Sequence, residues 1–136
     1  MDNINFSNYI EIQQDYQSLQ DNQYNVAYSI MIKASTELEY LGELFVDAEK
    51  EVSVFKVESE ALEANKCLEF SKEVSVNRAE KMSISDTEVV KAKEELFRAK
   101  KTLNNLQNMI NFLTRVYYDC QNIWKMGNRG YRESRG

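Results

Sequence analysis

The fold is decided by residues 85–126, which read SDTEVVKAKEELFRAKKTLNNLQNMINFLTRVYYDCQNIWKM. Residues 85–88 match a capping box, in which Ser85 accepts from the Glu88 amide and starts a helix. No proline or glycine interrupts this pattern before Gly127. Steps of three and four residues separate the apolar positions, which is typical of a helix that packs along one seam. These positions are Val89, Ala92, Leu96, Ala99, Leu103, Leu106, Ile110, Leu113, Tyr117, Cys120 and Trp124.

A second long helix is predicted for residues 22–70, because the same heptad step recurs there. Its seam residues are Tyr24, Ala27, Met31, Ala34, Leu38, Leu41, Phe45, Ala48, Val52, Phe55 and Leu62. Two helices with one repeat predict an all-α fold built on a long antiparallel hairpin with coiled-coil packing. We interpret Gly42, inside the second helix, as a point where a neighbouring helix approaches closely.

The remaining segments are less regular. Residues 7–20 form either a short helix or an arm that docks on a neighbouring subunit. Residues 71–84 reverse the chain, either with a short strand or by extending a helix. Gly127 suits the position after a helix end. We therefore expect a single helical domain over residues 1–126, with helices at about 7–20, 22–70 and 86–126, followed by a flexible basic tail at 127–136.

An extra apolar stripe on the last helix needs a second partner. Assembly into a homo-oligomer larger than a dimer is the simplest explanation, and a three-helix bundle closed by the N-terminal helix is the alternative. Under the first explanation the subunit interface contains Met109, Ile110, Phe112, Leu113, Val116 and Ile123.

The composition argues against most enzyme and membrane classes. The chain has no proline, no histidine and four glycines, which disfavours a β-rich fold and removes histidine-based catalysis and metal sites. Cys67 and Cys120 are more typical of buried thiols than of a disulfide in a cytosolic chain. Neither a signal-peptide pattern nor a membrane-length apolar run is present. We expect a non-enzymatic protein without metal or cofactor, in the cytoplasm, or in the host cytoplasm if it is phage-encoded.

Charge is divided unevenly along the chain. Residues 1–62 hold 12 acids and 3 bases, whereas residues 63–136 hold 10 acids and 14 bases. Such asymmetry is a sign of a charged partner. Glutamates at positions 37, 39, 43, 94 and 95, and the lysine-rich segment 91–101, have the pattern of ordinary solvated helix faces. The basic side chains of segment 91–101 could equally bind phosphates. Near the end of the chain, arginines could bind phosphates and aromatic residues could stack on bases.

A short element resembles one in a known family. Thr114-Arg115-Val116-Tyr117, followed by Asn122-Ile123, is similar to a Ser/Asn-Arg-x-aromatic element in the last helix of the UvsY-type recombination mediators of bacteriophages. The resemblance implies a ring-like helical oligomer that binds single-stranded DNA. It also implies help in loading a RecA-like recombinase onto DNA held by a single-strand-binding protein.

The chain departs from the family at one point, since Asp119 and Cys120 stand where a lysine is expected. This departure moves the predicted DNA contact toward the tail. The predicted DNA-binding residues are Arg115, Trp124, Lys125, Arg129, Tyr131, Arg132 and Arg135. The alternative hypothesis is a coiled-coil adaptor or inhibitor that acts through its acidic N-terminal helix, with its dense acids between Glu37 and Glu60.

Overall fold

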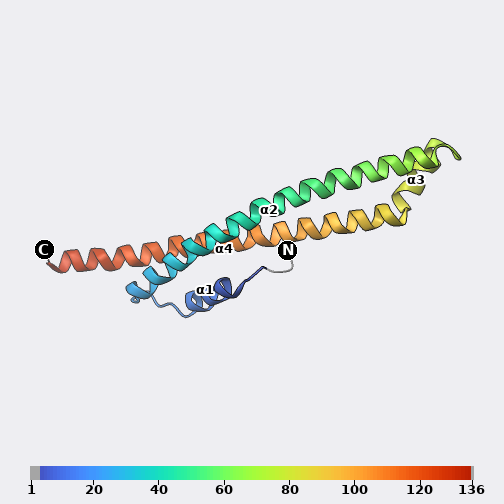
Figure 1. The fold of residues 1–136 in the computed structure, drawn as a ribbon. Helices are drawn as coiled ribbons and strands as arrows, with labels where there is room; N and C mark the ends of the chain where they lie inside the picture. Colours follow the sequence, from blue (N-terminus) through green and yellow to red (C-terminus); the bar gives the residue numbers. More distant parts are fainter. Residues whose placement is uncertain (1–3, 136) are drawn as a thin grey trace. The chain divides into compact units, whose positions relative to one another are not determined.

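The computed structural model describes residues 4–135, with side chains described for residues 4–129. Four helices make up this range, and it holds no strand (Figure 1). They are α1 (Ser7–Gln17), α2 (Tyr24–Phe70), α3 (Val76–Ser85) and α4 (Thr87–Arg135). Helix α2 packs against α4 as a hairpin, so the predicted all-α hairpin with a short N-terminal helix is confirmed.

Heptad spacing governs burial on both long helices. On α2 the residues Ala27, Ala34, Leu41 and Ala48 are each at most 1% exposed. On α4 the matching positions are Ala99, Leu106, Leu113 and Cys120, and these are at most 9% exposed. Because both sets recur every seven residues, each long helix keeps its heptad seam buried, as the sequence predicts. Among the described residues, every helix is too short or too polar to span a membrane.

The chain divides into two compact units. The first unit joins the described parts of residues 1–43 and 107–136, and the second comprises Leu44–Leu106. In the first unit α1 lies against α4, where the Phe112 ring meets the rings of Tyr9 and Tyr16 edge-on at centroid distances of 5.9 and 6.0 Å. Ile12 of α1 is only 1% exposed. Within this unit α1 therefore packs on the extra apolar stripe of α4 at Phe112, as the three-helix alternative predicts.

The second unit contains the chain reversal, which is neither a strand nor an extension of α2. After turn residues 71–74, Ser75 caps α3 by accepting a hydrogen bond from the Arg78 amide at 3.4 Å. Ala79 and Ser83 of α3 are buried. A separate ten-residue helix therefore closes the hairpin.

The start of α4 differs from the predicted capping box. Ser85 belongs to α3, and its hydroxyl donates back to the Lys81 carbonyl at 3.2 Å. Asp86 is the cap instead, because its extended backbone separates the two helices and its Oδ1 accepts from the amides of Glu88 and Val89 at 3.0 and 3.3 Å. The Lys66 ammonium lies 4.0 Å from the Asp86 carboxylate and 3.6 Å from that of Glu88.

The interpretations of Gly42 and Gly127 are both wrong. A Cβ built on Gly42 meets no atom within 4 Å, so no neighbouring helix approaches there. A Cβ built on Gly127 would lie 2.7 Å from the Tyr24 Cβ, so this is where α2 and α4 come close. No described glycine has a positive φ. Gly127 therefore does not end the helix: α4 continues to Arg135, beyond the predicted end at residue 126.

Candidate nucleic-acid interface on the last helix

The outer side of α4 in the first unit is an exposed strip of polar and basic residues. It lies at the heptad positions opposite the buried Leu113 and Cys120. We call it the α4 outer face. All of its members are exposed; they are Asn108, Asn111, Arg115, Tyr118, Asn122, Lys125 and Arg129.

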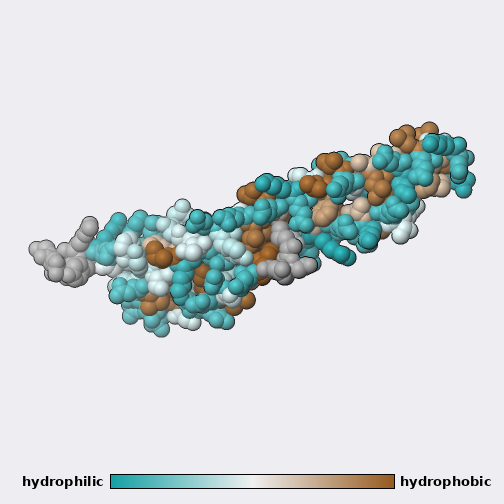
Figure 2. Space-filling model, in the orientation of Figure 1, coloured by the Kyte–Doolittle hydropathy of each residue, from teal (hydrophilic) through white to brown (hydrophobic). Residues whose placement is uncertain are grey.

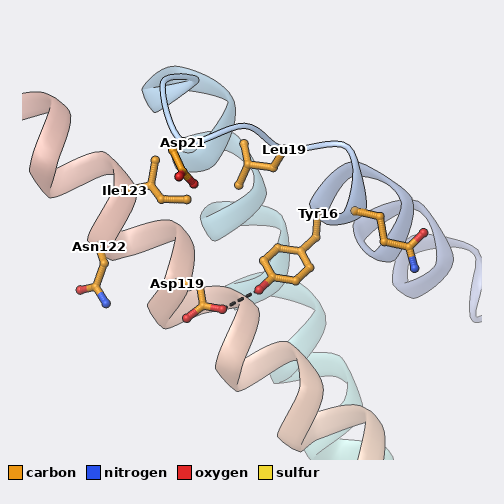
Figure 3. A pocket seen from close by; sticks show the side chains of 7 residues that line it. Tyr16, Leu19, Asp21, Asp119, Asn122 and Ile123 are labelled. Atoms are coloured by element: carbon orange, nitrogen blue, oxygen red, sulfur yellow. Dashed lines mark hydrogen bonds between the residues drawn. The ribbon is translucent and has the colours of Figure 1, made fainter.

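The α4 outer face contains no acid. Asp119 is the only acid between residues 107 and 129, and it lies at a different helix position, half-buried toward α1. The Tyr16 hydroxyl donates to its Oδ2 at 2.5 Å, as the dashed line in Figure 3 shows. The hydrogen bond to Asp119, followed by burial, raises the pKa of Tyr16 to about 12. The acid that interrupts the family resemblance therefore has a structural partner.

Tyr16 and Asp119 also line a surface cavity of about 530 Å³. Figure 3 shows Leu19 and Asp21 on one side of it and Asn122 and Ile123 on the α4 side. Asn122 thus belongs both to this cavity and to the edge of the outer face.

Arg115 stands over an aromatic cluster. Its guanidinium carbon lies 5.5 Å from the centroid of the Phe112 ring, within the range of a cation–π contact. Phe112 is itself fixed by Tyr9 and Tyr16 of α1. The exposed arginine is therefore held in place by packing between α1 and α4 while its charge still faces solvent.

Trp124 is half-buried rather than free for stacking on both faces. Its ring lies 5.1 Å from that of Tyr28 at a tilt of 41°. One turn further on, Tyr24 lies over Gly127. The tryptophan therefore helps to join the start of α2 to the end of α4, although it also borders a cavity of about 380 Å³ with Asn22 and Asn128.

The other predicted site residues fall into three groups. Lys125 and Arg129 are exposed on the helix. The side chains of Tyr131, Arg132 and Arg135 lie outside the described ones, while the backbone there is helical as far as Arg135. Among the predicted interface residues, Leu113 and Val116 are fully buried within the chain, and the rest are half-buried: Met109, Ile110, Phe112 and Ile123. The oligomer interface at these positions stays a prediction.

The predicted DNA-binding residues do not include Asn108, Asn111, Tyr118 or Asn122, although Asn122 belongs to the element that resembles the mediator family. Their common signal is a pair of heptad positions that carry no acid between residues 107 and 129, although Glu94 occupies one of these positions earlier on α4. This signal is visible only once the register is fixed. Tyr118 is 57% exposed, the largest apolar surface on this strip. The interpretation of Glu37 as part of a solvated helix face is also wrong, because this residue is only 4% exposed.

Comparison with protein-family models, with curated proteins and with solved structures finds no match for this chain. Within the described residues no group of three or more possible ligands could hold a metal ion.

Proposed function

We propose that this chain is a non-enzymatic single-stranded DNA-binding protein that acts as a recombination mediator in the cytoplasm. It would help a RecA-like recombinase onto DNA held by a single-strand-binding protein. The observation that carries the proposal is the acid-free α4 outer face, which includes Arg115 of the element that resembles the UvsY-type mediators.

The chemistry of this face suits a polyanion. Arg115, Lys125 and Arg129 can neutralise phosphates, and the three asparagines can donate hydrogen bonds to phosphate or sugar oxygens. The exposed ring of Tyr118 can stack on a base of any sequence. Because no acid lies on the strip, a bound strand meets no like charge along it.

The dimensions fit a short segment of one strand. From Asn108 to Arg129 the helix rises about 30 Å, at about 1.5 Å per residue. Arg115 is held on the Phe112 ring, so it supplies a fixed point about one third of the way along this path. Lys125 and Arg129 follow along the same side of the helix.

Recombinase loading can be tested through ATP hydrolysis. A RecA-type recombinase hydrolyses ATP when it occupies single-stranded DNA. Saturating the DNA with a single-strand-binding protein suppresses this ATP hydrolysis, because the recombinase is then kept off the strand. Adding the full chain should restore hydrolysis in a dose-dependent way, and Arg115→Glu should restore less. If the chain binds bare DNA but never restores hydrolysis, DNA binding stands and the mediator role is lost.

A second candidate is the protein adaptor that acts through α2. The exposed acids Glu39, Glu43, Asp47, Glu49, Glu58 and Glu60 favour it. Salt-dependent retention of the chain on single-stranded DNA separates the two proposals, since the adaptor requires none.

A further inference from the structure

The second half of α2 carries an apolar stripe on the side away from its buried seam. Its residues are spaced by three and four, and all of them are exposed: Val54, Val57, Ala61, Ala64 and Leu68. Val57 and Leu68 are each 66% exposed. Figure 2 shows hydrophobic residues reaching the surface along this part of α2. We call these five residues the α2 stripe.

The spacing sets the α2 stripe apart from scattered surface residues. Steps of three and four along one helix make a seam into which another helix can pack. Alanines at two of the three inner positions, Ala61 and Ala64, allow a neighbouring backbone or large side chain to come close. The seam runs for about 21 Å from Val54 to Leu68, at about 1.5 Å per residue.

A second exposed apolar site lies on α4 in the same unit. Val90 and Phe97 are one heptad apart and 40% and 68% exposed. They line a surface cavity of about 330 Å³ together with Lys93, Glu94 and Arg98. We call Val90 and Phe97 the α4 knob.

The two sites carry opposite charge. Residues 44–70 of α2 hold seven acids and three bases, and Glu58 and Glu60 directly flank the stripe. Residues 87–106 of α4 hold five bases and three acids, including the Arg98 beside Phe97. A partner for the acidic stripe should be apolar and basic, and the α4 knob of another copy meets both conditions.

We infer that the α2 stripe of one chain receives the α4 knob of a second copy of this chain. The two surfaces differ, so the contact is heterologous, and every copy keeps one free stripe and one free knob. Repetition of such a contact closes a ring or extends a filament. This inference goes beyond DNA binding, and it places self-assembly away from the stripe that α1 packs on in the first unit.

Complementation between two broken faces tests this contact. Val57→Glu disables the stripe, and Phe97→Glu disables the knob; both residues are more than half exposed, so neither change disturbs the core. Val46→Glu is the matched control, because Val46 is an exposed valine of α2 outside the stripe. Masses of the full-length chains are measured by sedimentation at micromolar concentration, and circular dichroism checks folding.

The wild type and Val46→Glu should assemble beyond a monomer. Each of the other variants alone should be monomeric, with a dissociation constant raised about tenfold or more by the buried charge. An equal mixture of Val57→Glu and Phe97→Glu should form a dimer. In this mixture the intact stripe of the Phe97→Glu chain can meet the intact knob of the Val57→Glu chain. A monomeric wild type would overturn the inference, and so would Phe97→Glu that assembles normally, since stripes would then pair with each other.

Discussion

Two helical glycines have opposite surroundings, and they form a matched pair for mutation. Gly42→Ala places a Cβ in open space, so it should stabilise the chain by about 0.5–1 kcal/mol through helix propensity alone. Gly127→Ala places its Cβ 2.7 Å from the Tyr24 Cβ, so it should destabilise the fold by about 1–3 kcal/mol. Urea unfolding of both variants checks this. Equal effects would mean that Tyr24 does not lie over Gly127.

Glu37 is the residue whose role the sequence conceals most. It is 4% exposed and its Oε1 has no hydrogen-bond partner in the described chain. Burial raises the pKa of its carboxyl, and a hydrogen bond from Asn8 lowers it in part. Because the folded pKa lies above the unfolded one, the associated stability is complete at low pH and is lost as the pH rises through the folded pKa.

Glu37→Gln should therefore stabilise the chain above that range, by about 1 kcal/mol, and should flatten the loss of stability with rising pH. Glu39→Gln is the control, since Glu39 is exposed two residues away. Thermal unfolding across pH 4 to 8 measures both. A Glu37→Gln profile that runs parallel to the wild type would contradict a buried, unpaired carboxyl.

At the scale of helices, one hydrogen bond fixes α1 to α4. Tyr16→Phe keeps the ring against Phe112 but removes the bond to Asp119, so it should loosen α1 at a cost of about 1 kcal/mol. The raised pKa of Tyr16, about 12, predicts that this contribution is full below pH 10 and lost as the pH approaches 12. Amide exchange of α1 reports the loosening, with exposed Tyr118→Phe as control. Unchanged exchange in Tyr16→Phe would show that packing alone holds α1.

The heptad pattern predicts the two long helices well, since both must keep one seam facing the other. It cannot identify which element packs on a second stripe, and in the first unit α1 packs on that stripe at Phe112. Ser85 and Asp86 are both good caps, so only the backbone decides between them. Gly127 suits a helix end and a close approach equally well. The α4 outer face could not be predicted from the sequence alone, because its definition requires both the helix register and the position of Asp119.

At the scale of the whole molecule, two exposed surfaces differ in their chemistry. The α4 outer face is basic, exposed and acid-free, and it is proposed for single-stranded DNA. The α2 stripe is apolar with acidic flanks, and it is proposed for a second copy. Assembly through the stripe would repeat the basic face around the oligomer, which strengthens the potential that a strand meets.

The most direct test of DNA binding by the α4 outer face is fluorescence anisotropy of labelled oligothymidine with the full chain across a salt series. The triple variant Arg115→Glu, Lys125→Glu and Arg129→Glu reverses the charge of that face. The control, Lys72→Glu, Arg78→Glu and Lys81→Glu, makes the same change in net charge at exposed residues of the chain reversal.

The wild type and the control should bind with a similar negative slope of log affinity against log salt. The face variant should lose about tenfold or more in affinity and about two units of slope, at about 0.7 per phosphate contact. Equal losses in both variants, or a wild type with no salt-dependent binding, would contradict the account.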